Sequence, residues 1–135
     1  DVVPYQFKLP AAPYVAKENT IIDIEFLKEK KKYLEQFCDL LIIEGAGGLM
    51  VPVEKDLFII DLIKIFEASA ILIAPSKLGC INDTILSVNA LKEKNIDFEL
   101  FINLYQDIES FEKVSKPFLI DYFKKLNFLE DLENL

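Results

Sequence analysis

The sequence predicts an α/β fold in which a mostly parallel sheet carries helices on both faces. Short apolar runs of strand length recur at residues 40–43, 70–74 and 98–103. Longer stretches with the apolar spacing of helices separate these runs. Strands that alternate with helices form parallel sheets, because each crossover lays a helix on a face of the sheet. By length, residues 1–135 are expected to form a single α/β domain.

The N-terminal half contains a connector, a helix and a strand. Residues 1–20 are rich in proline and lack periodicity, which indicates an irregular connector. Residues 22–37 place apolar side chains on one face of a helix whose other face carries lysines and glutamates. A strand over 40–43 follows. Residues 51–53 are expected to be extended, because proline and the residue before it favour that backbone.

The alternation continues after residue 56. Residues 57–66 are rich in bulky apolar side chains and could pass for a strand, but their length favours a helix, and Asp56 is a suitable N-cap. A strand over 70–74 leads into a helix from Ile81 to about Asn95. The remaining elements are a strand over 98–103 and a mostly helical part from residue 108 onward, interrupted at residues 116–117.

Composition narrows the classes of function. Two cysteines, Cys38 and Cys80, fit a reducing cytoplasm rather than a disulfide scaffold. A net charge of −8 argues against nucleic acid as a partner. It does not argue against ATP, because glycine loops, helix N-termini and Mg²⁺ can bind phosphate without a basic protein. The sequence has no histidine, which excludes catalytic triads that contain histidine and zinc sites built from histidine within it. No apolar run approaches the roughly 18 residues of a membrane span, so no membrane partner is expected.

A carboxylate and a glycine-rich loop follow the first predicted strand. Glu44 is followed by three glycines in the four positions from Gly45 to Gly48. In open α/β sheets, ligands bind beyond the carboxyl ends of the strands. Glycines there let backbone N–H groups approach a phosphate or carboxylate, and a glutamate can hold Mg²⁺. The pattern indicates an anion site; the alternative is a solvated glutamate beside an ordinary turn.

A second motif opens the helix that follows the strand over 70–74. Residues 79–82, Gly-Cys-Ile-Asn, open this helix, and at a helix start the unpaired N–H groups and the dipole favour an anion. Asn82 can add its side-chain amide, although a polar residue at a helix start is also ordinary. The thiol of Cys80 is interpreted as a small packing group.

Together, the segments IIEGAGGLMVPV and LGCIND resemble dethiobiotin synthetase, an enzyme family of the biotin pathway. The opening residues 4–16 are similar to that family's segment before its central helix, with Ala12 and Tyr14 where Ser and His are usual. The resemblance covers roughly residues 4–120 and implies a P-loop NTPase-like fold. That family begins with a strand and a phosphate loop, GxxxxGK[ST], and this sequence contains no such motif. It therefore resembles the C-terminal two-thirds of the enzyme, a partial domain without its first strands, and we expect it to be inactive alone.

The resemblance also implies a role for each candidate residue. Glu44 would bind the Mg²⁺ that bridges the phosphates of ATP, and Asn103 would recognise the adenine edge. The helix start would receive the substrate carboxylate across the subunit interface of a homodimer. No residue of this sequence is assigned as catalytic. The implied contacts are, for the nucleotide, Glu44, Gly45, Ala46, Gly47, Asn103, Leu104, Lys116, Pro117 and Phe118 and, for the substrate, Gly48, Gly79, Cys80, Ile81 and Asn82.

The implied activity is that of a cytoplasmic, ATP-dependent carbon–nitrogen ligase. It would close 7,8-diaminononanoate with CO₂ to dethiobiotin, using Mg²⁺ and ATP. Two alternatives stay open. One is a related amide-forming ATPase, although such enzymes usually carry a glutaminase domain. The other is a non-catalytic nucleotide- or partner-binding remnant of the same fold. Residues ahead of Asp1 that spell GxxxxGK[ST] would favour the enzyme.

Overall fold

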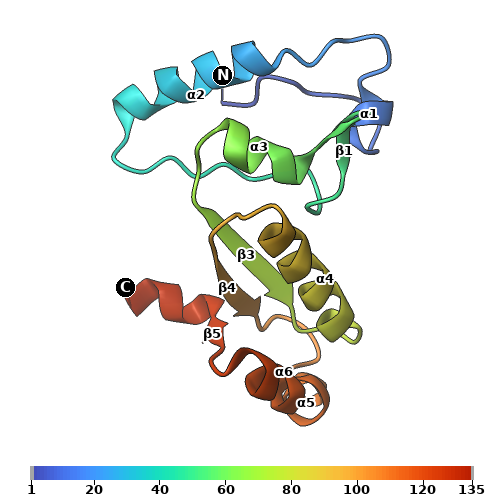
Figure 1. Cartoon of the computed structure of the whole chain (residues 1–135), viewed down its shortest axis with the longest axis vertical. Helices are drawn as coiled ribbons and strands as arrows, with labels where there is room; N and C mark the ends of the chain where they lie inside the picture. The colour runs from blue at the N-terminus through green and yellow to red at the C-terminus, as the bar shows by residue number, and fades with distance from the viewer. Residues whose placement is uncertain (1, 135) are drawn as a thin grey trace. The chain divides into compact units, whose positions relative to one another are not determined.

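The computed structural model describes residues 2–134 and divides into two compact units, with the boundary between Ala68 and Ser69. The first unit is coloured blue to green in Figure 1 and the second yellow-green to red. The single domain expected from the sequence stays a prediction.

The first unit is built mainly from helices and one small antiparallel sheet. The helix expected over residues 22–37 is confirmed, as α2 followed by a 3-10 turn. It begins after Asp23, whose Oδ1 accepts a hydrogen bond from the N–H of Phe26 at 3.1 Å. The N-terminal connector is irregular apart from one helical turn. The elements are α1 (Pro13–Ala16), α2 (Ile24–Leu34), η1 (Glu35–Phe37), β1 (Pro52–Glu54), β2 (Leu57–Phe58) and α3 (Ile59–Ile65).

The prediction of a strand over residues 40–43 is wrong for this structure. These residues belong to no sheet, and Leu40 and Ile42 are 77% and 83% exposed. A strand forms only where a neighbour satisfies its backbone N–H and C=O groups. Within residues 2–134 no strand pairs with this segment. Its apolar character alone therefore does not produce a strand.

The extended segment at residues 51–53 is confirmed as β1, which pairs with β2 in an antiparallel register that was not predicted. The helix expected over residues 57–66 is confirmed as α3, but Asp56 does not cap it. The carboxylate of Asp61 instead accepts a hydrogen bond from the N–H of Phe58 at 2.9 Å. The backbone before the helix is held by β2, so the helix starts two residues later than its pattern indicates.

The second unit contains the predicted parallel sheet. Its strands lie in the order β3, β4, β5, and both pairs are parallel. Ala70 is opposite Phe98 and Pro75 opposite Asn103, so β3 and β4 end at the same edge of the sheet. The elements are β3 (Ala70–Pro75), α4 (Cys80–Glu93), β4 (Phe98–Asn103), α5 (Ile108–Ser110), η2 (Phe111–Ser115), α6 (Lys116–Phe123), β5 (Asn127–Phe128) and η3 (Leu129–Asn134).

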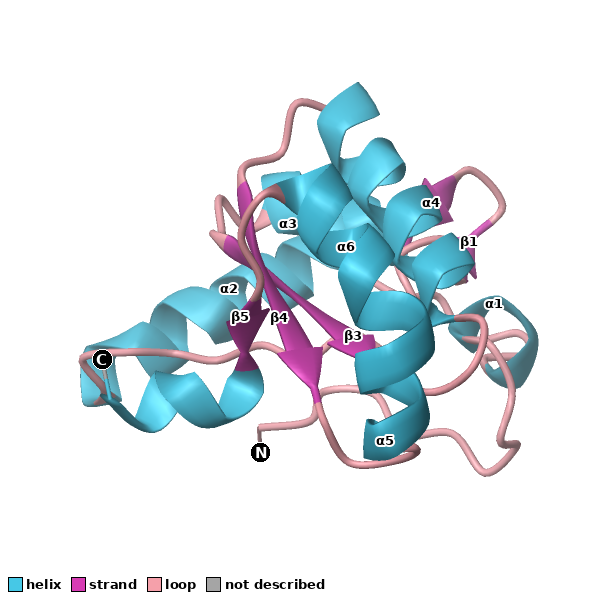
Figure 2. Ribbon diagram, turned by 90° about the horizontal axis from the view of Figure 1, so that it is seen from below, coloured by secondary structure: helices cyan, strands magenta, loops and turns pink. Residues whose placement is uncertain are grey.

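Helices α4 and α6 lie on the same side of this sheet (Figure 2). Their buried side chains meet alternate strand residues in one apolar cluster. The cluster consists of Ala74, Cys80, Ile102, Phe111 and Leu119. This packing fixes the start of α4 and the ends of β3 and β4, which carry the candidate site.

The C-terminal part is mostly helical, as predicted, but its interruption lies elsewhere. Residues 111–115 form a π-helical turn, η2, and Pro117 lies in the first turn of α6. Proline is tolerated there, because the first N–H groups of a helix have no partner within the helix. The irregularity falls on the turn before the proline. Strand β5 was not predicted, since two residues carry no periodic pattern.

Candidate functional site

The glycine loop belongs to the first unit. Gly47 adopts the left-handed conformation, with φ of +88°, and its N–H donates to the carbonyl of Gly45 at 3.1 Å. A β-carbon at Gly47 would lie 3.0 Å from Cγ2 of Val51, and one at Gly45 would lie 2.7 Å from Cγ2 of Ile59. The local structure therefore explains why glycine occupies both positions.

Gly48 differs from these two glycines. A β-carbon built on it has nothing within 4 Å, and its φ is not in the left-handed region. Nothing in the described residues requires a glycine there. Where the local structure does not require a glycine, the absence of a side chain can instead allow a ligand to approach the backbone closely.

Glu44 stands exposed at the start of this loop. Its carboxylate makes no hydrogen bond or ion pair with any of residues 2–134. In the same part of the chain, no three His, Cys, Asp or Glu side chains gather closely enough to hold a metal ion. Glu44 could therefore supply one oxygen ligand to Mg²⁺, with the remaining ligands coming from phosphate and water, as is usual for this ion.

The start of α4 belongs to the second unit. Gly79 precedes the helix with φ of +90°. The N–H of Cys80 donates to the carbonyl of Lys77 at 3.1 Å, whereas the N–H groups of Ile81 and Asn82 have no partner among the described residues. Those two groups are free to bind an anion. The thiol of Cys80 lies in the apolar cluster and is fully buried, which is the packing role expected for it.

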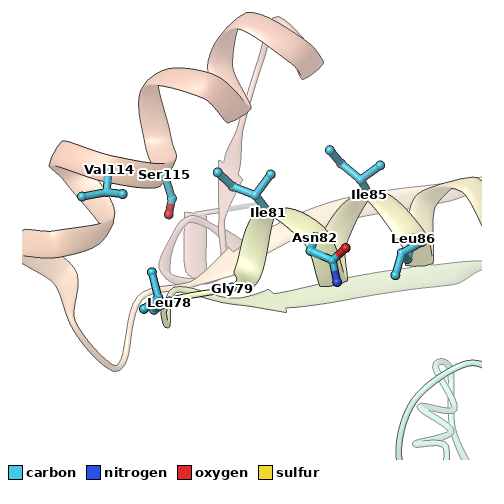
Figure 3. A pocket seen from close by; sticks show the side chains of 8 residues that line it. All are labelled: Leu78, Gly79, Ile81, Asn82, Ile85, Leu86, Val114 and Ser115. Atoms are coloured by element: carbon cyan, nitrogen blue, oxygen red, sulfur yellow. The ribbon is translucent and has the colours of Figure 1, made fainter.

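A pocket of about 470 Å³ opens beside this helix start (Figure 3). Its walls are mostly apolar, and its polar side chains are those of Asn82 and Ser115. Ser115 is only 5% exposed, and its hydroxyl oxygen points toward the side formed by Leu78 and Gly79 (Figure 3). The pocket is lined by Leu78, Gly79, Ile81, Asn82, Ile85, Leu86, Val114 and Ser115.

Ser115 was missed by the sequence reasoning. It belongs to the π-helical turn η2, more than thirty positions after the motif that it faces. A single serine among charged residues carries no signal of its own. Only the packing of η2 and α4 on one side of the sheet brings it to the pocket.

The carboxyl edge of the sheet carries Asn103 and Leu104. Asn103 ends β4 opposite Pro75, and its side-chain amide has no hydrogen-bond partner in the described part of the chain. Leu104 packs against the apolar cluster. Ser76, which was not predicted, is buried at this edge and is hydrogen-bonded to the main chain of Gln106.

The segment predicted to line the adenine pocket forms the first turn of α6. The ammonium group of Lys116 pairs with Glu112 at 2.7 Å and lies 5.3 Å from the ring centre of Phe128. Its charge is therefore already partly balanced. Phe118 is exposed and stacks on Tyr122, with ring centres 5.8 Å apart. Of this segment, the exposed ring of Phe118 is the group best able to meet a base.

None of the helices within residues 2–134 combines the length and the apolar character needed to cross a bilayer.

Comparisons with known proteins give a family model and several relatives that share one name. A family model described as an AAA domain matches residues 1–134. The ATP-dependent dethiobiotin synthetase of Sulfurovum sp. (strain NBC37-1) is 54% identical over 118 residues, which cover 87% of this chain and 56% of that protein. The synthetase of Wolinella succinogenes is 38% identical, and the match covers 96% of this chain and 62% of that protein. The synthetase of Methanocaldococcus jannaschii is 34% identical, and the match covers 96% of this chain and 67% of that protein. The chain thus spans somewhat more than half the length of the first two relatives.

Proposed function

The chain belongs to the dethiobiotin synthetase family, and on this basis we propose that the protein containing it makes dethiobiotin. It would convert 7,8-diaminononanoate and CO₂ to dethiobiotin at the expense of ATP, as a carbon–nitrogen ligase. The observation that carries this proposal is the 54% identity to a protein of that name over a region holding both motifs. The chain covers 56% of that relative, so the activity is proposed for a protein in which a phosphate loop accompanies these residues.

The proposed reaction needs no covalent protein intermediate. CO₂ adds to one amine of the substrate and forms a carbamate. A carbamate oxygen attacks the γ-phosphorus of ATP, and ADP leaves. The second amine then attacks the carbonyl carbon of the mixed anhydride, so that a carbon–nitrogen bond forms and phosphate is expelled. Catalysis of this kind rests on positioning and on stabilisation of charge.

The nucleotide and the reacting amines are assigned to the glycine loop. Free backbone N–H groups beside glycines suit phosphate oxygens, and the carboxylate of Glu44 has no partner within residues 2–134. We assign Glu44 to Mg²⁺, which neutralises the charge that develops on the phosphates. Gly48, whose missing side chain leaves open space, is assigned to the approach of the substrate.

The substrate carboxylate is assigned to the start of α4. The N–H groups of Ile81 and Asn82, which have no partner among the described residues, offer two donors. The side-chain amide of Asn82 donates to the carboxylate of Asp83 at 3.2 Å, which leaves its second hydrogen for the substrate, and the hydroxyl of Ser115 lies beside it. The apolar walls suit the hydrocarbon chain that links the carboxylate to the amines. In this proposal, the start of α4 faces the glycine loop of a second copy of the chain. The protein would then be a homodimer, and the substrate would lie across its interface.

The base of ATP is assigned to the carboxyl edge of the sheet. The amide of Asn103, which has no partner in the described part of the chain, can pair with the adenine edge. Leu104 and the segment Lys116–Phe118 are proposed to contact the ring. The cytoplasm is the proposed compartment, because ATP is available there and both cysteines, Cys38 and Cys80, are free thiols.

The proposal is tested with the protein made from its complete reading frame. Labelled bicarbonate, diaminononanoate and Mg-ATP are expected to give labelled dethiobiotin, with one ADP formed for each product. Omission of any one substrate should abolish the label. Nucleotide hydrolysis that continues without diaminononanoate and yields no dethiobiotin would contradict the proposal.

A further inference from the structure

The hydroxyl of Ser76 ties together the ends of two neighbouring parallel strands. Ser76 directly follows β3 and is 1% exposed. Its Oγ donates to the carbonyl oxygen of Gln106 at 2.5 Å, and the N–H of Gln106 lies 3.4 Å from the same Oγ. A single side chain thus holds both main-chain groups of a residue thirty positions away.

These bonds fix the loop that follows β4. The loop leaves the sheet at Asn103, and its first residue, Leu104, packs against the apolar cluster. At its far end, the carbonyl of Asp107 accepts a hydrogen bond from the N–H of Phe111 at 2.8 Å. Ser76 supplies the anchor between these two ends. Without it, the described residues offer no other partner to the main chain of Gln106.

The amide assigned to the adenine edge belongs to Asn103, the last residue of β4, from which the anchored loop leaves. The side chain of Asn103 has no partner among the described residues, so its placement depends on its backbone, which lies between the paired end of β4 and the anchored loop. A base contact requires donor and acceptor atoms within a few tenths of an ångström of their places. A loop held at both ends and in the middle provides that order, whereas a freely hydrated loop does not.

We propose that Ser76 is a positioning residue for nucleotide-base recognition, through the main chain of Gln106 and the loop that follows Asn103. This inference rests on the proposed function, because it assumes that Asn103 meets adenine. Ser76 itself touches no ligand. Its hydroxyl determines how strongly the protein prefers adenine over another purine.

The chain offers a matched control in Thr84. Its hydroxyl lies in the same unit and is also buried, at 2% exposure, but it has no hydrogen-bond partner in the described part of the chain. Ser76→Ala and Thr84→Val each remove one buried hydroxyl. Only the first removes an anchor of the loop.

The experiment measures binding of ADP and of GDP to the complete protein by calorimetry, with thermal unfolding of each variant beside it. Ser76→Ala should weaken ADP binding about five- to tenfold, the cost of one or two neutral hydrogen bonds, and leave GDP binding nearly unchanged. Thr84→Val should leave both affinities at the wild-type value. Ser76→Thr, which keeps the hydroxyl, should restore most of the preference.

Each outcome decides one question. If the wild-type protein does not bind ADP, the proposed function fails and the inference fails with it. If it prefers ADP and Ser76→Ala keeps the full preference, only the inference is overturned. Equal losses for ADP and GDP, or a Ser76→Ala protein that fails to fold while Thr84→Val folds, would assign Ser76 a purely structural role.

Discussion

Cγ2 of Ile59 occupies the place beside Gly45 that a side chain would need. A β-carbon built on Gly45 lies 2.7 Å from that methyl group, closer than real β-carbons approach any atom. Ile59 is the first residue of α3, so the glycine lets the loop pack against the start of that helix. Gly48, three positions later, meets no such neighbour. Substitutions at Gly45 and Gly48 are therefore expected to have different effects, the first on stability and the second on substrate binding.

Gly45→Ala should destabilise the protein. The added methyl group forces Ile59 or the loop to move, and overpacking of this kind costs about 1–3 kcal/mol. The free energy of unfolding, measured with urea, should fall by that amount. Unchanged stability would mean that the loop adjusts without cost.

Gly48→Ala should leave the free energy of unfolding within about 0.5 kcal/mol of the wild-type value, because its methyl group enters open space. If substrate approaches there, the KM for diaminononanoate should rise about tenfold or more, the effect of losing roughly 1.4 kcal/mol of binding. Steady-state kinetics on the complete protein measures it. A wild-type KM would remove Gly48 from the substrate site.

Glu44→Gln should reduce kcat by about a hundredfold or more, the order expected when one charged group that stabilises a transition state is lost. The fold should be unaffected, because the carboxylate has no partner among residues 2–134. A titration of activity against Mg²⁺ should show a higher requirement. Glu29→Gln is the control, an exposed glutamate of the same unit on α2. Equal behaviour of the two variants would exclude Glu44 as a metal ligand.

Asn82→Ala should raise the KM for diaminononanoate and leave the KM for ATP nearly unchanged, because it acts only at the carboxylate end. If the site lies across a two-fold interface, mixed dimers of Asn82→Ala and Glu44→Gln chains contain one intact site of two. A mixed dimer should then have about half the wild-type activity, so an equimolar mixture of chains that exchange at random should recover about a quarter. Failure of this rescue, or a fully active monomer, would refute the shared site.

Local sequence determined the elements whose pattern lies within one segment. The helix α4 and the strands β3 and β4 follow their predicted ranges to within one or two residues. Apolar spacing and terminal signals are properties of adjacent residues, so they can be interpreted without a partner. The two motifs, Glu44–Gly48 and Gly79–Asn82, were found in the same way, because each is continuous along the chain.

Tertiary structure alone decided the features that need a partner far away in the chain. Leu40 and Ile42 have the apolar character of a strand, yet no neighbouring strand is present in the described residues, so they remain exposed. Ser76 and Ser115 carry no pattern, yet packing brings one to Gln106 and the other to the start of α4. A helix satisfies its hydrogen bonds within its own segment, whereas a strand, a loop anchor or a pocket wall requires groups from elsewhere.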